Sequence, residues 1–198
     1  MEKEREEQVI SLCQKLIQQK SYSGEESGVV GVLSENMKQM GFDEVTVDKY
    51  GNIIGCIKGN RPGKKVLFDG HIDTVPVTEE AEWLYPPFAA EIHDGKIYGR
   101  GTSDMKGAVA AMTCAASNYA KDTGKDFAGE IYVAGVVHEE CFEGVAAREI
   151  NKSVRPDYVV IGEASQLNLK IGQRGRAEIV IETFGKPCHS ANPEKGIN

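Results

Sequence analysis

The sequence predicts an α/β protein, with a three-layer αβα domain around a central, mostly parallel mixed sheet and the start of an α+β domain after it. Three observations predict this class. Short apolar runs alternate with segments of helical periodicity. Residues 131–137 are almost continuously apolar, as in a central strand buried on both faces. The pattern changes near residues 172–175, where a second module begins.

Two amphipathic helices are expected first. Over residues 4–19, apolar side chains recur three and four residues apart, which places them on one face of a helix. Residues 26–40 repeat this spacing, and Gly41 follows where helices commonly end with a glycine.

Extended segments follow the second helix. Residues 52–58 and 65–68 are predicted strands. Residues 88–98 are a predicted hairpin, because the pair Asp94-Gly95 strongly favours a tight turn between two strands.

The remainder alternates helix and strand. Residues 105–121 are rich in alanine and predict a helix, and residues 144–151 predict another. Residues 158–161 are apolar and predict a second buried strand. Residues 177–184 alternate in polarity, which predicts an antiparallel strand with one solvent-exposed face.

These elements divide the chain into a predicted αβα domain at residues 1–172 and the beginning of a second domain at residues 173–198. The last segment is loop-like and no closing element follows it, so we expect the chain to be the N-terminal part of a longer protein.

Composition limits the kinds of ligand and environment that suit this protein. With 23 Lys+Arg against 30 Asp+Glu, the net charge of −7 disfavours nucleic acid and suits divalent cations better. No apolar run is long enough to span a membrane, and the charged start is unlike a secretory signal. The five cysteines form no C-x-x-C pair, which favours reduced thiols in a cytoplasmic protein.

The first candidate site segment, residues 69–75, follows a predicted strand. His71 and Asp73 face the same side if the extended conformation continues. A carboxylate beside an imidazole can fix the ring tautomer and increase its basicity as a metal ligand. The same two residues can also be a simple polar pair at the end of a strand.

The second segment, residues 99–107, is rich in glycine and precedes a predicted helix. It lacks the Gly-Lys-Ser/Thr ending of a phosphate-binding loop, and Asp104 stands where a dinucleotide-binding loop needs a glycine. A nucleotide-binding protein is therefore disfavoured. Asp104 is interpreted either as the N-cap of the helix or as a metal ligand.

Two further segments place carboxylates after apolar strands. Glu139 and Glu140 follow residues 131–137, and Glu163 follows residues 158–161. In an open α/β sheet, ligands bind beyond the carboxyl ends of the strands. One histidine among several carboxylates suits Zn²⁺, Mn²⁺ or Co²⁺, although a solvated loop explains the acidic pair equally well.

Together, four motifs in this order resemble the zinc amidohydrolase family of acetylornithine deacetylase, succinyl-diaminopimelate desuccinylase, aminoacylase and glutamate carboxypeptidase. The motifs are Gly70-His71-Ile72-Asp73-Thr74-Val75, Tyr98-Gly99-Arg100-Gly101-Thr102-Ser103-Asp104-Met105-Lys106-Gly107, Glu139-Glu140 and Gly162-Glu163. The segments Gly172-Gln173-Arg174-Gly175-Arg176, Cys188-His189-Ser190 and Pro193-Glu194-Lys195-Gly196 resemble the branch of selenium-metabolism-linked hydrolases.

The resemblance implies a fold of the zinc-peptidase type and two Zn²⁺ per protomer, with Co²⁺ or Mn²⁺ as substitutes. It implies that His71 and Glu163 bind one ion and Glu140 the other. Asp104 would bridge the two ions.

Three further roles are implied. Asp73 would be the hydrogen-bonding partner of His71, and Glu139 the general base. His189 would reach across a homodimer to the carbonyl oxygen of the substrate.

The substrate implied by the family is an N-acyl amino acid or a dipeptide. Arg174 and Arg176 are candidates for binding its carboxylate, or are solvated charges at the edge of a strand.

Family members are about twice as long as this chain. They return to the catalytic domain after a lid and supply a last histidine ligand. His93 and His138 look structural, so neither is a candidate for that last ligand. We therefore expect the 198-residue chain to be almost inactive alone.

A non-catalytic relative that binds a metal or a peptide is the alternative. The presence of Glu139, which such a relative could lose, disfavours it. A thiol nucleophile at Cys188 is also disfavoured, because the adjacent His189 points to the other side of an extended chain.

Overall fold

The computed structural model divides the chain into two compact units, Met1–Ala164 and Ser165–Asn198, and each is described by itself. It describes residues 2–142, 144–172, 174–175, 177 and 179–197. The predicted domain limits, 1–172 and 173–198, stay a prediction.

The first unit contains all the regular strands and the long helices among the described residues. In chain order these elements are α1 (Glu2–Gln18), α2 (Ser27–Gln39), β1 (Glu44–Val47), β2 (Ile53–Lys58), β3 (Arg61–His71), β4 (Glu91–His93), β5 (Lys96–Tyr98), α3 (Gly107–Thr123), β6 (Ala128–Val136), α4 (Val145–Val154) and β7 (Tyr158–Ile161).

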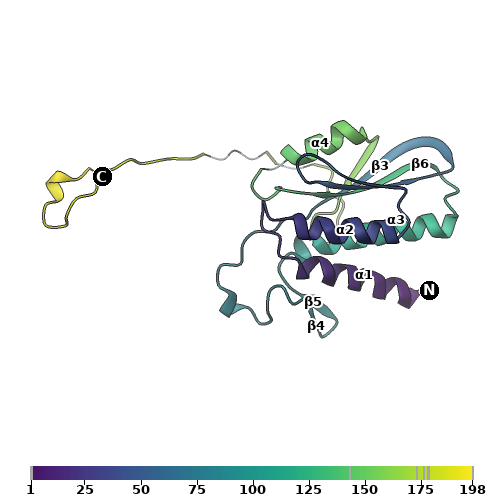
Figure 1. Cartoon of the computed structure of the whole chain (residues 1–198), viewed down its shortest axis with the longest axis horizontal. Coiled ribbons are helices and arrows are strands. Elements are labelled where there is room, and N and C mark those ends of the chain that lie inside the picture. The colour runs from purple at the N-terminus through teal and green to yellow at the C-terminus, as the bar shows by residue number, and fades with distance from the viewer. Residues whose placement is uncertain (1, 143, 173, 176, 178, 198) are drawn as a thin grey trace. The chain divides into compact units, whose positions relative to one another are not determined.

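Five strands form the main sheet in the order β1-β2-β6-β3-β7. β6 pairs in parallel with β3, and β3 in parallel with β7, whereas β2 is antiparallel to both β6 and β1. Helices α2 and α3 lie along one face, with α1 packed beside them, and α4 covers the other face (Figure 1). The predicted αβα fold with a mixed sheet is confirmed.

The two N-terminal helices form where the periodicity predicts them. Leu16 and Ile17 of α1 are fully buried, as are Leu33 and Met37 of α2, so both helices bury their apolar stripes in one core. Gly41 has a φ of +89°, the left-handed conformation expected of a glycine that ends a helix.

The predicted hairpin is also confirmed. β4 and β5 pair in antiparallel fashion on either side of Asp94 and Gly95. Both turn residues have positive φ, +49° and +71°, as a two-residue hairpin turn requires.

The prediction that residues 158–161 are buried is wrong. β7 forms at this place, but its four side chains are 48–60% exposed. It is the edge strand of the sheet, so among the described residues only β3 pairs with it. An apolar run identifies a strand but not the neighbours that would cover it.

The strand predicted at residues 177–184 is also wrong for the part that the structure describes. Ala177 and residues 179–184 have no regular secondary structure, because no neighbouring strand in the described part of their unit supplies a ladder. Glu178, Gln173 and Arg176 lie outside the described residues.

The second unit has little regular structure of its own. Lys186 and Ile197 exchange two backbone hydrogen bonds, and Pro193–Lys195 forms a short 3₁₀ turn between them. Across the described residues of the whole chain, none of the helices has the length and apolar character needed to cross a membrane.

Candidate metal centre

The carboxyl ends of three parallel strands meet at one edge of the sheet. β3 ends at His71, β6 ends just before the acidic pair, and β7 ends just before Glu163. Side chains from segments that are distant in sequence therefore converge where ligands of open α/β sheets bind.

His71 is the centre of this convergence. Its ring is almost fully buried, and Nδ1 donates to the backbone oxygen of Asp73 over 2.9 Å. Nε2 lies 2.9 Å from Asp104 Oδ1 and 3.4 Å from Glu163 Oε1. With Nδ1 occupied, Nε2 is the nitrogen available to a metal ion.

Burial alone would lower the pKa of His71. Hydrogen bonds to Asp73, Glu163 and Asp104 outweigh burial and raise that pKa, because the imidazolium is surrounded by negative oxygen. The contact with His71 in turn lowers the pKa of Glu163. A cation is therefore favoured at the point where these groups meet.

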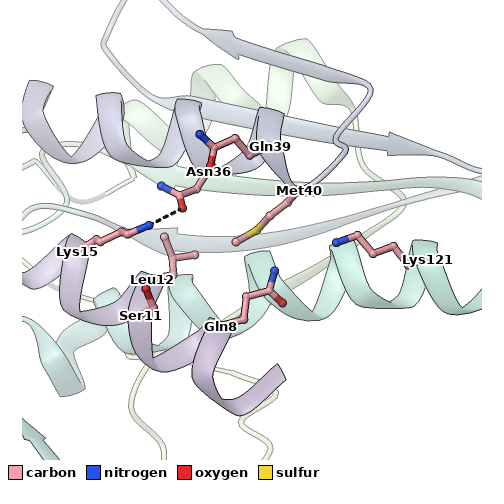
Figure 2. Close-up of a pocket in the computed structure, with 8 residues that line it drawn as sticks. All are labelled: Gln8, Ser11, Leu12, Lys15, Asn36, Gln39, Met40 and Lys121. Carbon is pink, nitrogen blue, oxygen red and sulfur yellow. Dashed lines mark hydrogen bonds between the residues drawn. The ribbon is translucent and has the colours of Figure 1, made fainter. Parts of the chain in front are cut away.

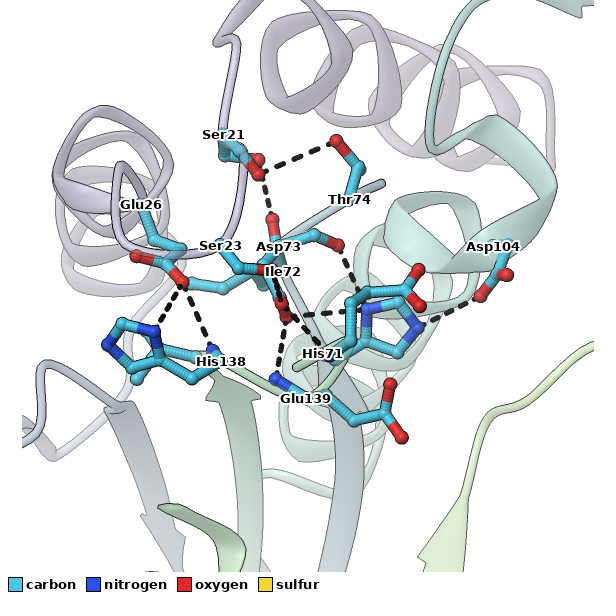
Figure 3. A network of polar contacts seen from close by, with 12 residues as sticks. Ser21, Ser23, Glu26, His71, Ile72, Asp73, Thr74, Asp104, His138 and Glu139 are labelled. Carbon is cyan, nitrogen blue, oxygen red and sulfur yellow. Dashed lines mark hydrogen bonds and ion pairs between the residues drawn. The ribbon is translucent and has the colours of Figure 1, made fainter. Parts of the chain in front are cut away.

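Asp104 comes from the loop that precedes α3. The helix begins at Gly107, and Asp104 makes no capping hydrogen bond, so the N-cap interpretation is wrong. The peptide bond between Asp104 and Met105 is cis. The carboxylate instead faces His71 (Figure 3).

Glu140 completes a cluster with His71 and Asp104. One ligand atom from each of the three lies within 4.8 Å of the others, as in a site that can hold a metal ion. Burial raises the pKa of both Glu139 and Glu140, and neighbouring carboxylates raise it further. Negative charge thus accumulates beyond what His71 neutralises, and this donor set fits a divalent cation.

Asp73 is fully buried and does more than face His71. Its Oδ1 accepts the backbone N–H of Glu139 and its Oδ2 that of Glu140, each over 3.1 Å, and Oδ2 also accepts the Ser23 hydroxyl over 2.6 Å. Burial would raise the pKa of Asp73, but the hydrogen bonds from His71, Ser23 and the backbone hold it below its ordinary value. The sequence predicts the approach to His71, which is 3.6 Å from Nδ1 to Oδ1, but not the backbone contacts.

Two glycines allow the strands to approach α3. A Cβ on Gly70 would lie 2.7 Å from the Met105 side chain, and one on Gly162 would lie 2.9 Å from that of Met112. Each glycine directly precedes a candidate ligand, His71 or Glu163. The close packing therefore fixes where these ligands leave the sheet.

The buried side chain of Lys106 ties the loop that carries Asp104 to the end of α1. Its ammonium group is buried and donates to the backbone oxygens of Leu16, over 3.0 Å, and Gln19, over 2.8 Å, at the end of α1. Burial lowers the pKa of Lys106 to about 8, opposed by the charge of Asp73. The sequence analysis gave this residue no role of its own, because nothing in the local sequence indicates that its charge is buried.

His189 belongs to the second unit and is exposed there. Its Nδ1 accepts the backbone N–H of Ala191 over 3.2 Å. Its implied role at a substrate carbonyl stays a prediction. Its neighbour Cys188, where the sequence disfavours a thiol nucleophile, is exposed as well.

A pocket of about 240 Å³ between α1, α2 and the end of α3 is a separate feature (Figure 2). Lys15, Asn36 and Lys121 line it, and Lys15 Nζ donates to Asn36 Oδ1 over 3.4 Å. Its lining contains no carboxylate, so it does not suit a divalent cation.

A mixed α/β sheet whose strand ends gather one histidine and several carboxylates belongs to the class of α/β proteins with a candidate site for divalent metal ions. The model of Peptidase family M20/M25/M40 matches residues 67–195, and the chain belongs to this family. The family predicted from the motifs is thereby confirmed, whereas the selenium-linked branch stays a prediction.

Individual relatives agree with this assignment. The chain is 38% identical over 180 residues to the uncharacterized protein YgeY of Escherichia coli K12, covering 90% of this chain and 44% of YgeY. It is 32% identical over 201 residues to succinyl-diaminopimelate desuccinylase 2 of Ruegeria, covering 96% of this chain and 50% of that enzyme. The chain thus spans about half the length of the curated relatives it matches.

The fold recurs in human carnosine dipeptidase 1. The two structures superpose with a TM-score of 0.66 at 24% identity, covering 81% of this chain and 39% of the dipeptidase. At this identity the likeness concerns the fold alone.

Proposed function

We propose that this chain contributes the metal ligands and the general base of an enzyme that hydrolyses the amide bond of an N-acyl amino acid or a small peptide. The observation that carries the proposal is the convergence of His71, Asp104 and Glu140 at the end of parallel strands. Membership of a peptidase family that includes a desuccinylase supports the class of reaction and substrate.

His71, Asp104, Glu140 and Glu163 would hold the metal. The family resemblance makes Asp104 the candidate for a ligand shared by two ions, and its place in the cluster, 2.9 Å from His71 Nε2, supports a role as a ligand. When bound, divalent ions supply Lewis acidity, which lowers the pKa of water and polarises an amide carbonyl. Two Zn²⁺ per protomer are proposed, with Co²⁺ or Mn²⁺ as substitutes.

Glu139 is proposed as the general base. It follows the same buried strand as Glu140, and its carboxylate lies near the His71 ring in Figure 3. A carboxylate whose pKa is raised by burial is a better proton acceptor than a solvated one. Glu139 would take a proton from the attacking water and deliver it to the leaving nitrogen. Asp73 meanwhile holds the ring of His71 and the backbone of the acidic pair.

The test is the Glu139→Gln substitution in the protein that this gene naturally encodes, purified without chelator. We expect hydrolysis of N-acyl amino acids and dipeptides to fall by at least ~100-fold in kcat, because proton transfer contributes about that much. Metal content, measured by mass spectrometry, should stay at the wild-type value. Glu6→Gln, an exposed position on α1, is the matched control for the change of charge.

Two outcomes would overturn the proposal. The first is a wild-type protein that takes up no zinc, manganese or cobalt on reconstitution. The second is a Glu139→Gln variant that keeps its metal and its full rate of hydrolysis.

The remaining roles are proposed on the family resemblance. His189 would contact the substrate carbonyl from the partner protomer of a homodimer. On the cysteine pattern, and not on the resemblance, we also propose that the enzyme acts in the cytoplasm. Measurable turnover by the purified 198-residue chain would contradict the expectation that it is inactive alone.

A further inference from the structure

The segment that carries the acidic pair is held by side chains rather than by the sheet. β6 ends at Val136, and the next four backbone N–H groups, those of residues 137–140, all donate to side-chain oxygens. The acceptors come from three separate parts of the first unit: Asn52, Glu26 and Asp73.

Asn52 holds the first of these groups. Its Oδ1 accepts the N–H of Val137 over 3.0 Å, while its Nδ2 donates to Asp48 over 2.7 Å and to the backbone oxygen of Ala146 over 3.1 Å. Asn52 is fully buried, so its amide orientation is fixed by partners on both sides.

Glu26 holds the second group. Its Oε1 accepts the N–H of His138 over 3.0 Å and that of Gly24 over 2.9 Å, and the His138 ring lies 3.6 Å away (Figure 3). Glu26 stands at the N-terminus of α2 but makes no capping bond to that helix. Its carboxylate is 6% exposed and is directed to the acidic segment instead.

The conformation of His138 explains why this acceptor matters. Its φ is +58°, a left-handed conformation that non-glycine residues adopt only when surrounding contacts hold them there. The chain turns at this residue from β6 toward Glu139 and Glu140. A charged acceptor on its N–H stabilises the turn more strongly than a neutral one.

We propose that Glu26 is a positioning residue for the acidic pair. By holding the His138 turn, it sets the direction in which Glu139 and Glu140 leave β6, and Asp73 then holds the next two N–H groups. Asn52 supports the same segment from its other end. The value of this arrangement for catalysis rests on the function proposed above, but the arrangement itself does not depend on a metal.

The experiment is backbone hydrogen exchange in the metal-free 198-residue chain, resolved by amide. In Glu26→Ala, we expect exchange at His138, Glu139 and Glu140 to accelerate by at least ~10-fold, because the lost bond and the freed turn open the segment. Amides at the centre of β6, such as that of Val133, should change far less. Glu26→Gln retains an acceptor oxygen and should restore most of the protection.

Glu25→Gln is the matched control, since Glu25 is exposed and adjacent in sequence. Uniform acceleration across β6 in Glu26→Ala would reduce Glu26 to a contributor to global stability and overturn the proposal. Unchanged protection of residues 138–140 would overturn it as well.

A parallel Co²⁺ titration separates this inference from the proposed function. If the wild-type chain binds no Co²⁺, the metal centre fails while hydrogen exchange still decides the role of Glu26. If the wild-type chain binds Co²⁺ and Glu26→Ala binds it with the same affinity, the acidic pair does not need Glu26 and the positioning role is wrong.

Discussion

β6 and β7 are both rich in apolar residues, and both lead into carboxylates of the candidate metal centre, yet their surroundings are opposite. β6 is the central strand, with β2 and β3 on its two sides, whereas β7 pairs only with β3 among the described strands. Val133 in β6 is fully buried, and Val160 in β7 is 48% exposed.

The segments that follow the two strands differ in the same way. Beyond β6, four consecutive N–H groups are held by buried side chains. Beyond β7, the backbone is tied to the sheet by the N–H of Gly162, which donates to the backbone oxygen of Asp69 over 3.0 Å. The comparison indicates that the backbone of Glu140 is held by buried side chains, whereas the Glu163 carboxylate is held by its contact with His71.

The largest expected difference is in metal affinity. Glu140→Gln should weaken Co²⁺ binding by about 100-fold and Glu163→Gln by about 10-fold, because a ligand that is already ordered loses less entropy on binding. Titration followed by Co²⁺ absorption measures both, with Glu25→Gln as the control. Equal losses, or a greater loss at Glu163, would break the comparison.

The next effect compares a glycine within β6, Gly135, with the glycine directly after β7, Gly162. A Cβ on Gly135 of β6 would lie 2.7–3.1 Å from Ile53, Ile72 and Leu33, whereas one on Gly162 mainly meets the flexible ends of methionines. We expect Gly135→Ala to lower the free energy of unfolding by about 3 kcal/mol and Gly162→Ala by about 1 kcal/mol. Urea unfolding followed by circular dichroism tests this, and a more harmful change at Gly162 would contradict it.

The smallest effect is removal of two methyl groups from each strand. Val133→Ala should lower the free energy of unfolding by about 2 kcal/mol, because it leaves a cavity in a close-packed core. Val160→Ala should change it by about 0.5 kcal/mol or less, because solvent already reaches that side chain. Similar losses in the same urea assay would mean that β7 is covered in solution.

Local sequence patterns were sufficient to predict many of the helices and strands. The helical stripes of α1 and α2, the turn at Asp94-Gly95 and the apolar run of β6 each carry their own signal, and all form as predicted. β1 was not predicted, because Glu44–Val47 is too short and too exposed for alternation to stand out. β7 was misjudged because burial depends on neighbouring strands that its own four residues do not encode.

The residues of the candidate site also divide into those that the sequence predicts and those that it does not. His71, Glu140 and Glu163 follow apolar strands, so topology rules bring them together from the sequence alone. Glu26 and Asn52 lie in loops, and their partners are reached only through tertiary contacts. Nothing in the local sequence separates the buried Glu26 from its exposed neighbour Glu25.

The buried Lys106 has a consequence for how the chain can be shortened. Its ammonium group donates hydrogen bonds to two carbonyl groups at the end of α1, so the first helix helps to hold the Asp104 loop in place. A deletion that removes α1 would take away the Leu16 acceptor and the helix that packs beside this ammonium group, and it would leave the Gln19 acceptor at a free chain end. Trimming from the N-terminus should therefore destroy the metal centre although no ligand is touched, whereas a cut after Ala164 falls between the two units and should spare it.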